Sequence, residues 1–75
     1  MRVTFDNVLV CDVRKTTFDD KTYYSLVVYQ DGKLYRISIS EDAVTTFKDV
    51  VGQSFSFEAH MSTYDGKVKF KFIQD

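Results

Sequence analysis

The sequence predicts an all-β domain, a small barrel of five strands with one short helix between the third and fourth strands. Runs of β-forming residues flank two Asp-Gly dipeptides, Asp31-Gly32 and Asp65-Gly66. Asp-Gly in that setting favours a two-residue hairpin turn. The segment between the two hairpins, residues 40–52 (SEDAVTTFKDVVG), has the spacing of a helix instead. With 75 residues in all, residues 1–75 are expected to form a single domain.

Composition supports a packed, β-rich domain. Aromatic residues make up 16% of the chain and proline is absent, which argues against disorder. The single cysteine, Cys11, cannot form an internal disulfide, suits a reducing compartment and is expected in the core. Met1 leads into a strand-like run without a leader or a long apolar segment. We therefore expect a complete, soluble, intracellular protein with no membrane partner.

The formal net charge of −1 is not that of a strongly basic nucleic-acid binder. The distribution of the charged residues matters more than their sum, because most acidic residues lie in the predicted turns and helix. Several basic residues lie on predicted strands: Arg2, Arg14, Arg36, Lys67, Lys69 and Lys71. A nearly neutral chain can thus present a basic surface.

Residues 3–14 (VTFDNVLVCDVR) are expected to form the first strand. Its apolar residues fall on both parities: Val3, Phe5, Leu9, Cys11 and Val13 on one, Val8 and Val10 on the other. A strand that is apolar on both sides is either central or strongly bent, as in a small barrel. Residues 15–21 (KTTFDDK) are polar apart from Phe18 and are expected to form a projecting loop.

Residues 22–40 (TYYSLVVYQDGKLYRISIS) are expected to form the second and third strands. A two-residue turn pairs Tyr29 with Leu34 and Val27 with Arg36, and directly opposite residues share a face. One face is then a core face: Tyr24, Leu26, Val28, Tyr35, Ile37 and Ile39. The other mixes rings, hydroxyls and a guanidinium: Tyr23, Ser25, Val27, Tyr29, Leu34, Arg36 and Ser38. A three-residue loop would place Arg36 beside core residues, so the two-residue turn is favoured.

The helix is expected to start after Ser40 as N-cap and to stop at Gly52. Val44, Phe47 and Val51 are spaced to form its apolar stripe, a plug over the core. Residues 54–61 (SFSFEAHM) alternate cleanly, with inward residues Phe55, Phe57, Ala59 and Met61. A turn with Tyr64 opposite Lys67 then pairs Met61 with Phe70 and Ala59 with Phe72 on the same apolar face.

Strand, strand, strand, helix, strand, strand is the element order of the OB-fold, a five-stranded, partly open Greek-key barrel. An SH3-like barrel has no natural place for a helix at that point. A β-grasp fold would need a longer helix directly after the first hairpin.

OB-folds bind oligonucleotides across the outer face of strands two and three, between the loops that follow strands one and four. Aromatic rings there stack on bases without sequence preference, and basic residues hold phosphates. The candidate nucleic-acid-binding residues are Arg14, Phe18, Lys21, Tyr23, Tyr29, Arg36, Tyr64 and Lys69. Plain alternatives exist, because tyrosines are common on exposed sheet faces and lysines on solvated edges, while Phe18 can fold back onto the barrel rim.

Catalytic and metal-binding patterns are not found in the sequence. His60 is the only histidine, and Cys11 has no partner at a ligand spacing. The glycines have turn or cap explanations rather than a phosphate-loop pattern. We expect that the protein is not an enzyme and that it binds no cofactor, no metal and no small-molecule substrate.

The segment RKTTFDDKTYYSLVVYQDGKLYRISI joins a basic, aromatic loop to a tyrosine-bearing strand. In this segment, in length and in strand order, the chain resembles the small OB-fold single-stranded DNA-binding proteins of filamentous phages, the gene-five type. The resemblance implies a homodimer that coats phage or plasmid single strands during replication in the bacterial cytoplasm. The slight net acidity and the evident helix depart from that group.

Two other functions fit the same surface. The tyrosine face can be the interface of a protein-interaction module, such as a phage accessory or host-inhibitor subunit, since tyrosine and arginine are enriched at interfaces. RNA binding is a third option, because stacking does not distinguish ribose from deoxyribose.

Overall fold

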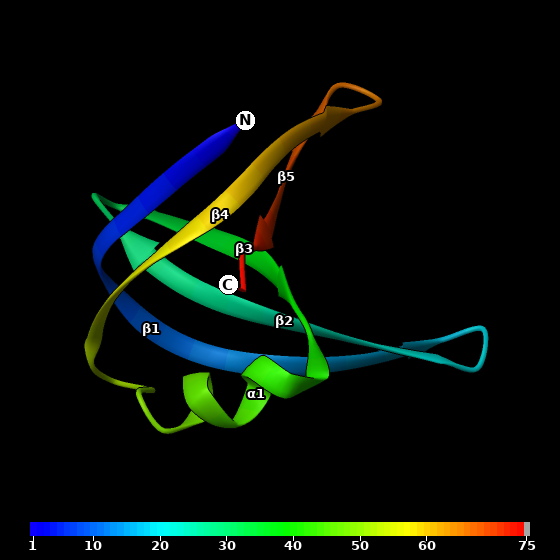
Figure 1. Cartoon of the computed structure of the whole chain (residues 1–75), viewed down its shortest axis with the longest axis horizontal. Coiled ribbons are helices and arrows are strands. Elements are labelled where there is room, and N and C mark those ends of the chain that lie inside the picture. Colours follow the sequence, from blue (N-terminus) through cyan, green and yellow to red (C-terminus); the bar gives the residue numbers. More distant parts are fainter. Residues whose placement is uncertain (75) are drawn as a thin grey trace.

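The predicted OB-fold-like barrel with one short helix is confirmed by the computed structural model, which describes residues 1–74 (Figure 1). The elements are β1 (Arg2–Phe18), β2 (Lys21–Gln30), β3 (Lys33–Ile39), α1 (Glu41–Lys48), β4 (Ser54–Tyr64) and β5 (Lys67–Phe72). The strands close in the order β1-β2-β3-β5-β4, with β4 paired back onto β1. The β3–β5 pairing is parallel and is the shortest in the barrel, so the fewest residues join neighbouring strands there.

Both Asp-Gly hairpins have the predicted register. Tyr29 pairs with Leu34 at the end of the β2–β3 hairpin, and Tyr64 pairs with Lys67 in the β4–β5 hairpin. Asp31 and Asp65 have φ angles of 52° and 55°, and the glycine after each is also in the left-handed region. Positive φ at both central residues defines the turn whose twist matches the flanking strands, which explains why the dipeptide predicts the register correctly.

Strand β1 is interrupted by two irregularities, one between Phe5 and Val8 and one between Val10 and Asp12. Each changes which side chains face inward, because an extra residue in a strand reverses the alternation beyond it. The buried apolar residues of the strand are Phe5, Val8 and Val10. The expectation that Cys11 lies in the core is therefore wrong: it sits at the second bulge and is exposed. Of the two alternatives for this strand, central or strongly bent, the structure shows the bend (Figure 1).

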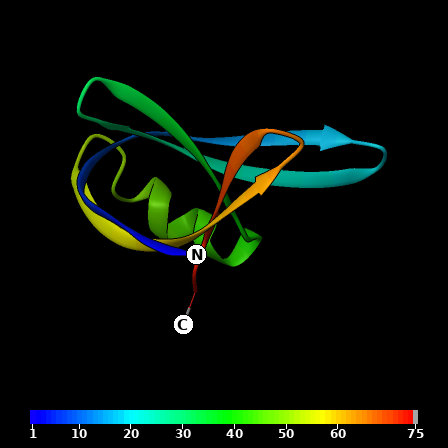
Figure 2. The same ribbon diagram turned by 90° about the horizontal axis from the view of Figure 1, so that it is seen from above.

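The prediction of a projecting loop over residues 15–21 is also wrong. Strand β1 continues to Phe18 and β2 begins at Lys21, with Asp19 and Asp20 as a two-residue turn. The two aspartates have φ angles of 51° and 61°, a conformation that aspartate tolerates better than most residues. The result is a two-stranded arm that extends beyond the barrel (Figures 1 and 2).

Helix α1 covers one end of the barrel (Figure 1). Ser40 is at the N-cap, as predicted, but its hydroxyl donates to Gln74 Oε1 at 2.8 Å rather than capping the helix. The helix ends at Lys48, well before Gly52. Val51 therefore lies outside the helical period and is 43% exposed, so its assignment to the apolar stripe is wrong.

Phe47 makes the helix a plug over the core, as predicted. Its side chain is fully buried. Its ring lies edge-on to three others, with centroid distances of 5.6 Å to Phe55, 5.6 Å to Phe57 and 4.9 Å to Phe72. Such edge-to-face packing adds to the stabilisation from burial alone.

Candidate nucleic-acid interface

The outer face of β2 and β3 is extended by β1 on one side and β5 on the other, and strand pairing aligns its residues in rows. One row contains Arg14, Ser25, Ser38 and Lys71. The next contains Asp12, Val27 and Arg36, and a third contains Leu9, Tyr29 and Leu34. The face thus combines cations, hydroxyls and apolar groups, unlike the core face of the same strands.

The four predicted ring residues are all accessible. Phe18 is 66% exposed and Tyr23 53% exposed, both on the β1–β2 arm. Tyr29 is 44% exposed near the β2–β3 turn, and Tyr64 is 70% exposed on the β4–β5 hairpin. Phe18 therefore does not fold back onto the barrel. The ring–ring contacts of residues 1–74 involve other aromatic residues, so no other ring there covers these four.

Arg36 lies between two of the other predicted cations, Arg14 and Lys69. It lines a shallow depression of about 320 Å³ together with Arg14, and a second one of about 270 Å³ together with Lys69. Arg14, Arg36 and Lys69 therefore form a line of positive charge from β1 across β3 to β5. An extended polyanion can follow such a line, one phosphate per cation.

The β4–β5 hairpin carries two of the predicted binding residues, Tyr64 and Lys69. Lys69 Nζ lies 5.4 Å from the centroid of the Tyr64 ring, a cation–π contact. The candidate interface ends on its other side at the β1–β2 arm, where Lys21 pairs with Phe18. The arm and the β4–β5 hairpin leave the barrel as separate projections (Figure 1). The structure therefore brings Arg14, Arg36 and Lys69 together, but not Lys21 and Phe18 with Tyr64.

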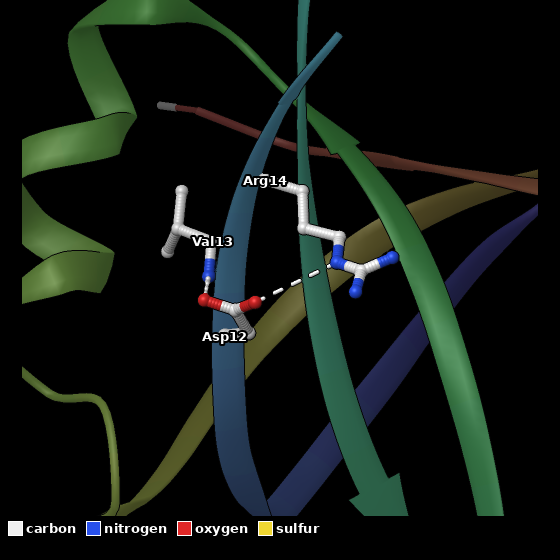
Figure 3. A network of polar contacts seen from close by, with 3 residues as sticks. All are labelled: Asp12, Val13 and Arg14. Carbon is white, nitrogen blue, oxygen red and sulfur yellow. Dashed lines mark hydrogen bonds and ion pairs between the residues drawn. The ribbon is translucent and has the colours of Figure 1, made fainter.

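Sequence reasoning missed Asp12 (Figure 3). Its Oδ1 accepts a hydrogen bond from the Val13 amide at 2.9 Å, and its Oδ2 lies 3.5 Å from Arg14 Nε. Simple alternation places Cys11 opposite Val27, and only the bulge brings Asp12 to that position. A conflict in the sequence points to the bulge, since Val10 and Val13 are both apolar although an odd number of steps separates them.

The chemistry available on this face is stacking, hydrogen bonding and charge pairing. Within residues 1–74 there is no group of three or more His, Cys, Asp or Glu side chains placed to hold a metal ion. In the same part of the chain, no helix has the length and apolar character needed to cross a membrane.

Comparison with known proteins gives no match: neither a protein-family model, nor a curated protein, nor a solved structure matches the chain.

Proposed function

We propose that the protein binds single-stranded DNA without sequence preference across the outer face of β2 and β3. The observation that carries the proposal is a line of three cations, Arg14, Arg36 and Lys69, flanked by exposed tyrosine rings. A single strand offers the complementary groups, namely phosphates at regular intervals and base faces that are free to stack. Double-stranded DNA keeps its base faces stacked, so the rings have nothing to contact there.

Stacking supplies the larger part of the proposed affinity. Each base on an aromatic ring contributes about 1–3 kcal/mol by alanine substitution, whatever the base. Electrostatics contribute less, since the chain has a net charge of −1. With three phosphates neutralised, the slope of log affinity against log salt is expected to be about −2, at about −0.7 per phosphate on a single strand.

The biological setting follows from the resemblance to gene-five-type proteins rather than from the geometry. That resemblance supports a homodimer that coats phage or plasmid single strands during replication in the cytoplasm of a bacterium. Binding of RNA by the same face is a third, weaker option, because stacking rings accept bases of either nucleic acid.

Fluorescence anisotropy with a labelled oligo-dT of about 20–30 nucleotides tests the proposal. We expect saturable binding at low salt that weakens only moderately at physiological salt. A duplex of the same length is the control and should bind much more weakly. The absence of oligo-dT binding even at low salt would contradict the proposal.

One observation favours a protein-interaction module as a second candidate. Leu9, Tyr29 and Leu34 form an exposed apolar row across three adjacent strands. Such a row can pack against a second copy or another protein, just as it can pack against a nucleic-acid base. The same titration separates the two functions, since a face used only for protein contacts gives no signal with oligo-dT.

A further inference from the structure

Of residues 1–74, Asp12 is the one acidic residue lining the depression between Arg14 and Arg36. It pairs with Val27 across β1 and β2, and Val27 pairs with Arg36 across β2 and β3, so the carboxylate lies in the middle of the proposed interface. A carboxylate at this position opposes the binding of a polyanion. Its placement depends on the bulge at Cys11.

The carboxylate is held in place from two sides. The Val13 amide donates to Oδ1, and Arg14 Nε lies beside Oδ2 (Figure 3). The side chains of Asp12 and Arg14 are 58% and 59% exposed, so water screens the pair and it is weak. The amide contact is local to the backbone and does not depend on Arg14. Asp12 therefore stays beside the cation when the pair opens.

We propose that Asp12 occupies the position at Arg14 that a phosphate would take, and so limits the affinity of the face for single strands. A phosphate that takes the Nε side of Arg14 must displace Asp12, and one that binds through Nη1 and Nη2 still lies beside a carboxylate that the Val13 amide holds near the guanidinium. Phosphate is the stronger competitor, because guanidinium binds it with two parallel hydrogen bonds whereas Asp12 contacts only one nitrogen. This inference rests on the proposed function.

Asp12→Asn tests the inference, since asparagine keeps an oxygen that can accept from the Val13 amide and removes only the charge. Oligo-dT affinity should rise about threefold to tenfold, the effect of one unit charge near a phosphate in water. The slope of log affinity against log salt should stay near about −2, because the wild type already neutralises three phosphates and the substitution adds no phosphate contact. Asp49→Asn, at the exposed end of α1, is the matched control for net charge and should change neither quantity.

A double-mutant cycle shows whether the effect acts through Arg14. In an Arg14→Ala background the gain from Asp12→Asn should disappear. A gain that persists there would overturn the inference in favour of general repulsion. An affinity equal to that of the wild type would also overturn it, as would a lower affinity, which would indicate that the carboxylate accepts a hydrogen bond from thymine N3–H. If neither the wild type nor Asp12→Asn binds oligo-dT, the proposed function itself fails, which is a different result.

Discussion

Replacing Phe47 by alanine is expected to lower the free energy of unfolding by about 3–5 kcal/mol, the range for a fully buried phenylalanine. The ring is the centre of a four-ring cluster and closes one end of the barrel. A domain of this size has roughly 4–11 kcal/mol of stability, so the variant loses a large share of it. Urea unfolding followed by far-UV circular dichroism measures the change.

Val51→Ala is the control for this prediction, because Val51 was expected in the same stripe but is exposed. Its effect should stay within about 0.5 kcal/mol. Phe47→Leu keeps most of the buried apolar area and provides a measurable variant if Phe47→Ala does not fold. Near-wild-type stability of Phe47→Ala, or a loss from Val51→Ala of similar size, would contradict the role assigned to the plug.

Tyr29→Ala is expected to weaken oligo-dT binding by about 5-fold to 150-fold, which corresponds to losing one stacked base. Because the ring carries no charge, the salt dependence of binding should not change. Arg36→Ala should act differently, reducing the slope of log affinity against log salt by about 0.7 as well as the affinity. Anisotropy titrations at several salt concentrations measure both quantities.

Tyr29→Phe is the matched control, since it keeps the ring and removes only the hydroxyl. It should bind nearly as well as the wild type. Equal affinities for Tyr29→Ala, Arg36→Ala and the wild type would show that the strand binds elsewhere, provided that all three proteins are folded by circular dichroism.

The elements that could be predicted from the sequence are those set by local chemistry. Asp31-Gly32 and Asp65-Gly66 fix their own turns, and the alternation of the flanking strands then assigns each side chain to a face. The β1–β2 arm follows the same rule, but its turn is Asp19-Asp20, a weaker pattern that allows a loop as well. The end of α1 was not predictable, because the last apolar residues continue the helical spacing while the chain already turns towards β4.

The bulges of β1 limit what the sequence reveals about the site. Tyr23, Tyr29 and Arg36 were placed correctly on the outer face because β2 and β3 pair without interruption. The position of Asp12 on that face could not be predicted, because a bulge reverses the direction of every side chain beyond it. The position of the bulge in turn depends on closing the barrel around the buried Val8 and Val10. The acidic residue at the centre of the proposed interface is therefore placed by tertiary structure rather than by local sequence.

The most direct measurement is a titration of ¹⁵N-labelled protein with oligo-dT, followed by two-dimensional ¹H–¹⁵N NMR spectra. We expect the shifted amides to fall on the outer-face strands and the arm, including Val27, Arg36 and Tyr23, while amides of α1 stay unchanged. Shifts centred on α1, or no shifts at saturating oligonucleotide, would contradict binding across the face of β2 and β3.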